Sequence, residues 1–547
     1  MLWFERPFLA ILRREYAASM RFSEDDTAEV MPAAPEFPCQ LYVHVPFCEV
    51  LCPFCSFHRV RYNDAKTHRY FEALRREIQL YHDAGFRFGD VYVGGGTPTV
   101  NADELIATLE LVRRGSPVRT VSIETNPNHL DPATLVRYRD AGVTRLSVGV
   151  QSFDDGLLAG MERLDKYGNG ELIRERLAAV QGLFPTLNVD MIFNLPGQTL
   201  AMLEHDLDVL TGLGVDQISF YPLMTAPTAR HKMEKSMGRN DPSLRHPMYE
   251  MILRRVQAAE YHAASAWCFS RNQGMFDEYI IDQDDYVGVG SGAFSYVGGA
   301  YYSTTFSLNH YCRRIEGGQS GITQRRTVTC KDRMRYDFLV RLFSGELRRD
   351  YIERRYGRAF LFRMAPELVA MRAIGALRYE NGTIRLTERG MYCWVLMMAE
   401  FFNSVNNVRE QMREHIRAGG AACVLEEGIN GQMITLYDKG SHIPLLWTHL
   451  IPATLEGRAM HNVQNAMVAA AMAFSLGIRL DAIRQGLRTF DTTFFQAPGR
   501  MNVFNEHPFK VLFDYGHNAH AVGVMADLAQ RLDVTGRRIV VLAGPGD

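Results

Sequence analysis

The sequence predicts an α/β fold, an incomplete barrel of six βα units followed by smaller domains. Three observations support this: β-rich segments alternate with helical ones from residue 40 to about 225, the expected strands are apolar on both faces, and 547 residues suffice for three or four domains. The expected strands are residues 41–45, 91–93, 118–124, 145–151, 188–193 and 217–221. Six units fall short of the eight that close a barrel.

Helical patterns separate these strands. The segment 67–84 has an apolar stripe at helical spacing, and Gly85 is placed to end it. This stripe consists of Phe71, Leu74, Ile78 and Tyr81. A second helix is expected to begin at Asn101, with Glu104 three residues later as a capping pair.

The later segments differ in pattern. Beyond residue 230 an aromatic and glycine-rich stretch is expected to continue the sheet, and Asn381-Gly382 marks a hairpin between helices. Helices with one small hairpin suggest a winged-helix-like cap, used as an intramolecular lid because the segment lacks a basic recognition stripe. A helix at about 461–477 and strands up to 540–543 follow. The predicted domains are an amino-terminal arm at 1–39, the barrel at 40–230, its continuation at 231–326, the cap at 327–413 and a carboxy-terminal segment at 414–547.

Charge and hydropathy exclude several classes of protein. The 60 Lys and Arg residues nearly balance the 62 Asp and Glu residues, and no basic block of a nucleic-acid binder is present. No apolar run approaches the roughly 18 residues of a membrane span, and charges interrupt the first 20 residues. We therefore expect a cytoplasmic protein whose partners are small molecules.

Three of the nine cysteines, Cys48, Cys52 and Cys55, fall within eight residues after the first expected strand. Thiolates at this spacing suit a [4Fe–4S] cube whose fourth iron stays open to an amine and a carboxylate. A structural zinc site completed by His44 or His58, or three unconnected core cysteines, would give the same triplet. The residues that we expect in the core are Cys268, Cys312, Cys330, Cys393, Cys423 and His310.

Glycine or polar residues recur at the carboxyl ends of the strands, where barrels build their ligand sites. Residues 94–96 are three glycines whose free N–H groups are expected to bind a ligand carboxylate, unless they only form a tight turn. Glu124 ends the third strand, Gln151 ends the fourth and Asp190 lies in the fifth. One such residue often only anchors a loop, but several on successive strands predict a ligand site.

From about residue 40 to residue 410 the chain resembles the oxygen-independent coproporphyrinogen III oxidase family of radical S-adenosylmethionine (SAM) enzymes. This family also includes haem-chaperone and methyltransferase relatives. The resemblance rests on the cysteine triplet and on GGGTPT at 94–99, SIETNP at 122–127, RLSVGVQSF at 145–153 and VDMIFNLPGQT at 189–199.

The resemblance implies which residues hold the cofactors. Cys48, Cys52 and Cys55 would ligate the [4Fe–4S] cluster. A first SAM would contact Tyr42, Gly95, Glu124 and Met224. A second SAM, or the substrate in the same volume, would contact Phe54, Gly96, Thr97, Gln151, Arg163, Asp190 and Phe294. The candidate catalytic residues are Tyr42, Glu124, Gln151, Arg163 and Asp190. Arg163 is expected either to bind a carboxylate through two hydrogen bonds or to form an ion pair on a helix surface.

The resemblance also implies a reaction, the reductive cleavage of SAM to a 5′-deoxyadenosyl radical that abstracts hydrogen from a porphyrinogen-like substrate. In the oxidase this leads to oxidative decarboxylation in porphyrin biosynthesis, with electrons from a flavodoxin or a ferredoxin. Phe57 stands where the oxidase has a fourth cysteine, and residues 1–39 and 265–271 depart from its pattern. Methylation through the second SAM and haem chaperoning therefore stay open as alternatives.

From about residue 414 the chain resembles a second family, the Mur-ligase-like part of cyanophycin synthetase. The motifs are residues 431–434, 443–447, 461–465, 498–500 and 514–518. The matching positions Asn462, Asn465, Arg500, Asp514 and His517 would line a nucleotide. The phosphate-binding loop and the ATP-grasp module of that family are missing, so we expect no ligase activity, and we expect a degenerate appendage or an artificial gene fusion rather than a segment that a partner completes.

Overall fold

The structure is a computed structural model that describes residues 4–19, 31–224, 227–272, 284–408, 416, 419–428, 431–493, 495–516, 519–532 and 536–541. The chain divides into two compact units, Met1–Arg409 and Glu410–Asp547, and each is described by itself.

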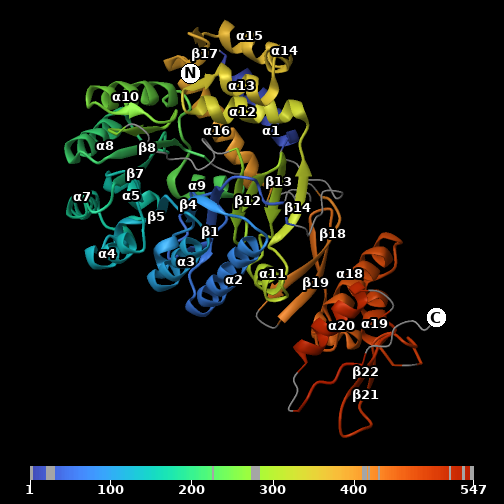
Figure 1. Ribbon diagram of the computed structural model, residues 1–547. Helices are drawn as coiled ribbons and strands as arrows, with labels where there is room; N and C mark the ends of the chain where they lie inside the picture. Colours follow the sequence, from blue (N-terminus) through green and yellow to red (C-terminus); the bar gives the residue numbers. More distant parts are fainter. Residues whose placement is uncertain are drawn as a thin grey trace. The chain divides into compact units, whose positions relative to one another are not determined.

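A mixed sheet of twelve strands forms the centre of the first unit (Figure 1). Six neighbouring parallel strands lie in sequence order across it, and they correspond to the six strands expected from the sequence. They are β1 (Cys39–Val45), β4 (Phe88–Gly95), β5 (Thr120–Thr125), β6 (Arg145–Gln151), β7 (Thr186–Phe193) and β8 (Gln217–Pro222). Apolar residues along these strands are buried, as their two-sided hydrophobic pattern predicted.

Further strands extend the sheet at both edges. The stretch beyond residue 230 continues it, as expected, because β11 pairs parallel to β1 and β12, β13 and β14 follow antiparallel. These strands are β11 (Tyr286–Val289), β12 (Phe294–Val297), β13 (Ala300–Thr304) and β14 (Ile322–Thr327). Strands β10 (Cys268–Ser270) and β9 (His262–Ala263) lie beyond β8.

Helices that connect the parallel strands lie outside the sheet (Figure 1). They are α2 (Asp64–Asp83), α3 (Ala102–Gly115), α4 (Pro132–Asp140), α5 (Asp155–Gly160), α6 (Leu164–Tyr167), α7 (Gly170–Ala179) and α8 (Leu200–Leu213), with α9 (Pro227–Met237) and α10 (Arg245–Ala258) after β8. The predicted apolar stripe of α2 is fully buried. Asn101 caps α3 by accepting a hydrogen bond from the Glu104 amide, whereas the Glu104 carboxylate pairs with Arg75 and His68 instead of completing a capping box.

The last part of the first unit is mainly helical. Its elements are α11 (Leu308–Glu316), α12 (Cys330–Phe343), α13 (Arg349–Tyr356), α14 (Ala359–Arg363), α15 (Ala365–Ala373) and α16 (Glu388–Val408). A small sheet of β15 (Glu346–Arg348), β17 (Thr383–Leu386) and β16 (Leu377–Glu380) lies among them. The predicted hairpin is confirmed, since Asn381 and Gly382 both have positive φ between β16 and β17. The amino-terminal helix α1 (Glu5–Ser19) packs on α16, where Arg13 pairs with Glu400 at 2.8 Å.

The second unit contains a three-stranded antiparallel sheet of β18 (Ala422–Gly428), β19 (Gly431–Asp438) and β20 (Ser441–Trp447). The other elements are α18 (Met460–Ser475), α19 (Leu480–Thr489), β21 (Asn502–Phe504), β22 (Val511–Phe513) and α20 (Ala519–Arg531). Val540 and Val541 of the expected strand 540–543 are not in a strand, and residues 542–543 lie outside the described residues.

The described helices include none with enough length and apolar character to cross a lipid bilayer. Cys268, Cys312 and Cys393 are buried, as expected of core residues, and Cys330 and Cys423 are half-buried. The expectation for His310 is wrong: this residue is exposed in the first turn of α11, where its amide donates to the Ser307 cap.

Candidate functional site

The three clustered cysteines lie on one loop at the carboxyl end of β1. The loop leaves through β2 (Phe47–Cys48) and returns through β3 (Val60–Arg61), and the Tyr62 amide donates to the Cys48 carbonyl at 2.8 Å. Arg59 braces the loop from inside by donating to the carbonyl oxygens of Cys52 and Cys55. Cys48 and Cys52 are buried and Cys55 is half-buried. Their thiols are thus held on a closed loop rather than spread through the core.

The histidines of the zinc alternative are engaged elsewhere. Nδ1 of His44 bonds to the Tyr42 hydroxyl at 2.9 Å and its Nε2 to the His58 carbonyl at 3.0 Å, while Nε2 of His58 contacts Ser291 Oγ at 3.2 Å. Among the described residues no three His, Cys, Asp or Glu side chains gather closely enough to hold one metal ion. In a cube each thiolate binds a different iron, so the sulfurs need not converge on one point. His44 and His58 thus have hydrogen-bond partners other than a metal, and the three cysteines remain the candidate ligands of an iron–sulfur cube.

A buried polar network connects two of the cysteines. Thr97 Oγ1 donates to Cys48 Sγ at 3.8 Å, and Asn126 Nδ2 donates to Thr97 Oγ1 at 2.8 Å. The Oδ1 atom of Asn126 accepts from the Arg163 guanidinium at 3.0 Å, and a second guanidinium nitrogen of Arg163 donates to Cys52 Sγ at 3.6 Å. Thr97, Asn126 and Arg163 therefore form one chain from sulfur to sulfur.

Arg163 lies in the interior, with 4% of its surface exposed. Its guanidinium also donates to the Gly149 carbonyl and stacks 4.2 Å from the centre of the Tyr167 ring, and Nε is buried with no hydrogen-bond partner among the described residues. An ion pair on a helix surface, one alternative from the sequence, is therefore wrong, because α5 and α6 fold the residue inward over the cysteine loop. The unsatisfied Nε is a donor that a ligand in this interior would satisfy.

The turn after β4 requires glycine, because a side chain at Gly95 or Gly96 would clash with its neighbours. A Cβ at Gly95 would lie 2.6 Å from the His44 ring, and one at Gly96 would lie 2.6 Å from the Phe47 carbonyl oxygen. The expectation of free N–H groups is wrong here, because the Gly95, Gly96 and Thr97 amides donate to Glu124, Val45 and Phe47 within the protein. The turn holds the cysteine loop against β4 and β5, and Glu124 also accepts from the Tyr92 hydroxyl at 2.8 Å.

Two further candidates lie on β6 and β7. Gln151 ends β6 with a φ of 79°, next to a shift in the register between β6 and β7. This backbone conformation is strained, and the hydrogen bonds of the two residues that follow stabilise it. The buried Asp206 on α8 accepts from Ser152 Oγ at 3.0 Å and from the Phe153 amide at 2.7 Å. Both oxygens of Asp190 are oriented as well, by Ser147 at 2.8 Å and by Asn188 at 2.7 Å.

The remaining candidates connect the cysteine loop to strands on either side of β1. Phe54 is buried in the cysteine loop, and the Met224 carbonyl after β8 accepts from Ser56 Oγ of that loop at 3.3 Å. Phe294 at the start of β12 lies 6.0 Å from Phe306, whose ring meets His58 at 5.6 Å. The structure therefore brings residues next to β8 and β12 close to the cysteine loop.

A carboxylate inside the C-x3-C segment, Glu49, binds three residues of other segments, and the sequence analysis did not single it out. Glu49 accepts from Lys166 at 2.8 Å, from Asn128 at 2.8 Å and from His129 at 3.1 Å. Burial raises the pKa of Glu49, but the hydrogen bonds from Lys166 and Asn128 outweigh it and lower the pKa overall. Asn126 was missed too, although its place after Glu124 at the end of β5 marked it as a polar strand-end residue.

Burial dominates the titration of Cys48. It raises the pKa of the Cys48 thiol to about 12, more than the hydrogen bond from Thr97 lowers it. Metal ligation requires the thiolate and releases the proton, so metal loading is coupled to pH. Burial also raises the pKa of Asp206 to about 7.

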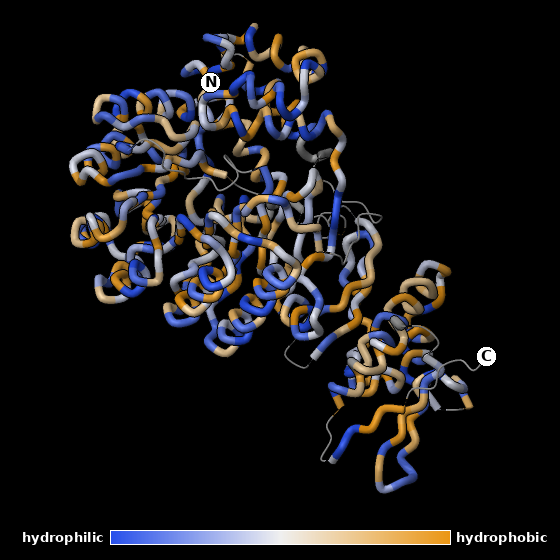
Figure 2. The backbone as a smooth tube through the Cα atoms, viewed as in Figure 1, coloured by the Kyte–Doolittle hydropathy of each residue, from blue (hydrophilic) through white to orange (hydrophobic). Residues whose placement is uncertain are grey.

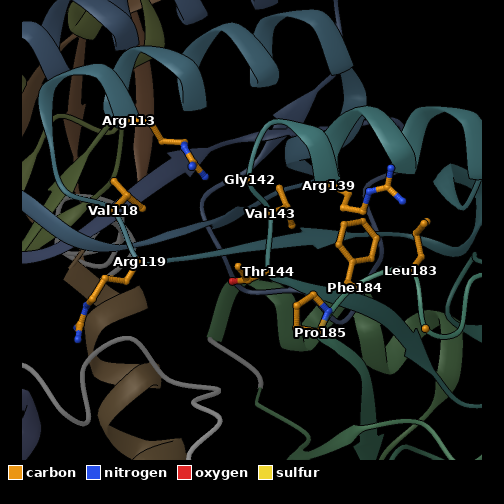
Figure 3. Close-up of a pocket in the computed structure, with 11 residues that line it drawn as sticks. Arg113, Val118, Arg119, Arg139, Gly142, Val143, Thr144, Leu183, Phe184 and Pro185 are labelled. Atoms are coloured by element: carbon orange, nitrogen blue, oxygen red, sulfur yellow. The ribbon is translucent and has the colours of Figure 1, made fainter.

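A cavity of about 570 Å³ lies at the amino ends of the parallel strands, between the loops that precede β5, β6 and β7 (Figure 3). Arg113, Arg119 and Arg139 lie around an apolar floor that includes Phe184. Arg119 and Arg139 extend in opposite directions and pair with Asp90 and Asp140, so the guanidinium groups do not converge on one ligand.

The second unit carries the residues of the other resemblance. Asn462 donates to the Ala453 carbonyl at 2.7 Å, Asn465 donates to Asn462 at 3.2 Å, and Asp514 accepts from the Met501 amide at 2.9 Å. Arg500 is exposed, and His517 lies outside the described residues. None of these contacts involves the cysteine site.

Comparisons with known proteins identify relatives of this chain. The family model of the radical SAM superfamily matches residues 42–210. The heme chaperone HemW of Mycobacterium tuberculosis is 31% identical over 302 residues, which cover 52% of this chain and 76% of that protein. The heme chaperone HemW of Bacillus subtilis is 27% identical over 366 residues and is covered to 95%.

Relatives from the oxidase branch match as well. The oxygen-independent coproporphyrinogen III oxidase of Salmonella typhimurium is 28% identical over 410 residues, covering 69% of this chain and 87% of that protein. The solved structure of coproporphyrinogen III oxidase (HemN) from Escherichia coli, a radical SAM enzyme, has a TM-score of 0.60, with 22% identity, and covers 69% of this chain and 95% of that one. The chain therefore belongs to the radical SAM superfamily, in the family that contains HemW and the oxygen-independent coproporphyrinogen III oxidases.

Proposed function

We propose that this protein is a radical SAM enzyme that acts on a porphyrinogen-like substrate by oxidative decarboxylation, as the oxygen-independent coproporphyrinogen III oxidases do. The observation that carries the proposal is the closed loop of Cys48, Cys52 and Cys55, with hydrogen-bond donors aimed at two of its sulfurs. When bound there, the [4Fe–4S] cluster and SAM supply a 5′-deoxyadenosyl radical that abstracts hydrogen from the substrate.

The roles of the residues around the loop in this proposal are those that the family resemblance implies. Cys48, Cys52 and Cys55 would hold three irons of the cluster. Tyr42, Gly95, Glu124 and Met224 line a first SAM site on the β1, β4, β5 and β8 side. Phe54, Gly96, Thr97, Gln151, Arg163, Asp190 and Phe294 line the volume for a second SAM or for the substrate.

Two charged groups in that volume have defined chemistry. Arg163 presents a buried cation and an unsatisfied Nε to a carboxylate, such as a propionate or the carboxylate of SAM. Asp190 has its carboxylate oriented by Ser147 and Asn188 and accepts a hydrogen bond from an ammonium or hydroxyl group. Arg163 is buried and Asp190 is half-buried, so water is excluded more completely from the guanidinium than from the carboxylate.

The test is anaerobic reconstitution of the full chain with iron and sulfide, followed by incubation with SAM, a strong reductant and coproporphyrinogen III. We expect iron–sulfur absorbance, 5′-deoxyadenosine, and product masses that show loss of carboxyl groups. The proposal fails if the protein forms the cluster but yields neither 5′-deoxyadenosine nor a changed substrate. Gain of methyl groups would assign the protein to the methyltransferase alternative.

Haem chaperoning is a second candidate, favoured by two observations. The HemW proteins are among the relatives, and Phe57, 44% exposed, stands where the oxidase pattern has its fourth cysteine. Haem titration of the reconstituted protein separates this candidate: stoichiometric haem binding without consumption of SAM supports it, and unchanged haem spectra reject it.

The wider organisation is part of the proposal. We propose a partial (β/α)6 barrel at 40–230 with its continuation at 231–326, an amino-terminal arm at 1–39, a winged-helix-like cap at 327–413 and an inactive Mur-ligase-like segment at 414–547. We also propose a cytoplasmic location, because an oxygen-sensitive cluster needs a reducing compartment, and a flavodoxin or ferredoxin as electron donor. The parallel strands β1 to β8 and the helices with the β16–β17 hairpin support this division.

A further inference from the structure

We infer that Asn126 is a positioning residue that aims Thr97 and Arg163 at the sulfurs of Cys48 and Cys52, and that this network raises the reduction potential of the cluster. The inference rests on the proposed cluster site and adds a function for residues that the family resemblance associates with SAM or does not mention. It follows from the four hydrogen bonds that connect the two sulfurs.

The amide of Asn126 decides the direction of each hydrogen bond. Thr97 Oγ1 accepts from Asn126 Nδ2 at 2.8 Å, which leaves its own hydroxyl hydrogen to point at Cys48 Sγ. The Oδ1 atom of Asn126 and the Gly149 carbonyl engage one terminal nitrogen of Arg163, so the other terminal nitrogen faces Cys52 Sγ. A guanidinium has only donors, so Oδ1 must face Arg163, and the orientation of the amide follows.

The effect on the potential follows from charge. Reduction adds one negative charge to the cluster, and hydrogen-bond donors and a cation next to its sulfurs stabilise the more negative state. Arg163 contacts the Cys52 sulfur, the Asn126 side-chain amide, the Gly149 carbonyl and the Tyr167 ring, and no carboxylate is among these contacts. Because Arg163 is almost fully buried, solvent screens its charge only weakly.

Substitutions can remove a hydrogen-bond donor while keeping the volume of its side chain. Thr97→Val keeps the shape of Thr97 and removes the hydroxyl, while Thr97→Ser keeps the hydroxyl. Asn126→Asp replaces the Nδ2 donor by an acceptor, which turns the Thr97 hydroxyl away from Cys48 and adds a negative charge. Thr108→Val is the matched control, since Thr108 is a buried threonine whose hydroxyl donates only to the Glu104 carbonyl in α3.

The experiment is a redox titration of the anaerobically reconstituted full chain, followed by electron paramagnetic resonance, with iron content and circular dichroism measured for each variant. We expect more negative potentials for Thr97→Val and Asn126→Asp, with the larger shift for Asn126→Asp, and wild-type potentials for Thr97→Ser and Thr108→Val. Loss of iron in Thr97→Val but not in Thr97→Ser also supports the inference.

Two results would overturn it. One is a wild-type potential in Thr97→Val and Asn126→Asp at wild-type iron content. The other is loss of the cluster in Thr97→Ser as well as in Thr97→Val, because the serine retains the donor. Failure of this inference can be distinguished from failure of the proposed function. If the proposed function were wrong, the wild-type chain would bind no cluster or would not cleave SAM at any potential.

Discussion

The two units of the chain differ in how they bury hydrophobic residues. In the first unit one continuous core runs through the parallel strands and the surrounding helices to α16. The described residues of the second unit form two small clusters, one of nine buried residues around β19 and α18 and one of three around Met501. Because burial contributes roughly 25 cal/mol per Å² of apolar surface, the first unit has the larger driving force for a rigid frame.

The exposed surface shows the same difference. The described part of the second unit exposes large apolar side chains, such as Leu476 at 77% and Phe495 at 95%, and Figure 2 shows hydrophobic residues along its β21–β22 hairpin. The first unit also exposes some, such as Phe362 at 86%, but it buries ionisable groups such as Arg163 and Asp206 with hydrogen-bond partners. A site that must orient donors to within tenths of an ångström belongs in such a frame, so we locate the chemistry in the first unit.

The largest expected effect is loss of the metal from the first unit. Changing Cys52 to Ala removes one of three ligands, and we expect almost complete loss of iron and of iron–sulfur absorbance after reconstitution, because three thiolates are the minimum that holds the cube. Cys330→Ala is the control, since this half-buried cysteine on α12 should not affect iron content. Full iron content in Cys52→Ala would disprove the cluster site.

The next effect is on stability and compares the two units directly. Leu146→Ala, at a fully buried position of β6, should cost about 2 to 5 kcal/mol, whereas Leu476→Ala, at an exposed position of the second unit, should cost less than about 0.5 kcal/mol. Differential scanning calorimetry of the full chain measures both changes. Equal shifts of the unfolding transitions would mean that the two units do not differ in burial as described.

A smaller effect concerns pH. Burial raises the pKa of Asp206 to about 7 from 3.8, so the folded state holds this proton more tightly than the unfolded chain. Its contribution to stability is fully present below about pH 4 and is lost as the pH rises through about 7. We expect the melting temperature of the wild type to fall more between pH 5 and pH 8 than that of Asp206→Asn.

The control for this prediction is an exposed carboxylate. Asp83→Asn, at the end of α2, should reproduce the pH dependence of the wild type, because this group lies on the surface and accepts only from Gln79. Parallel melting curves of the wild type and Asp206→Asn would show that Asp206 does not titrate in this range.

The smallest expected effect is that of removing the second unit. Deletion of residues 416–547 should leave iron content and 5′-deoxyadenosine formation unchanged, because every contact of the cysteine site described above lies in the first unit. The measurement is anaerobic reconstitution of both lengths side by side. A shortened chain that folds by circular dichroism but binds no iron would show that the second unit supports the site.

Local patterns predicted the frame of the first unit well. All six parallel strands appear where apolar runs follow helical segments, and the stripe Phe71, Leu74, Ile78 and Tyr81 is buried as its spacing required. The expectation for the glycine turn was right in one respect and wrong in another. Its glycines are needed for close packing, but its amides donate to groups of the protein rather than to a ligand. Arg163 also lacked a local signal, because burial depends on how α5 and α6 fold back over the loop.

The sequence by itself determined the positions of the six parallel strands, the cysteine loop and the polar strand ends, because periodicity and spacing are properties of neighbouring residues. Only the tertiary structure decided that Thr97, Asn126 and Arg163 meet between Cys48 and Cys52. These residues lie on the loops after β4, β5 and β6, and parallel strands bring the loops at their carboxyl ends to one edge of the sheet. The direction of each hydrogen bond then follows from packing between distant segments, which no local pattern encodes.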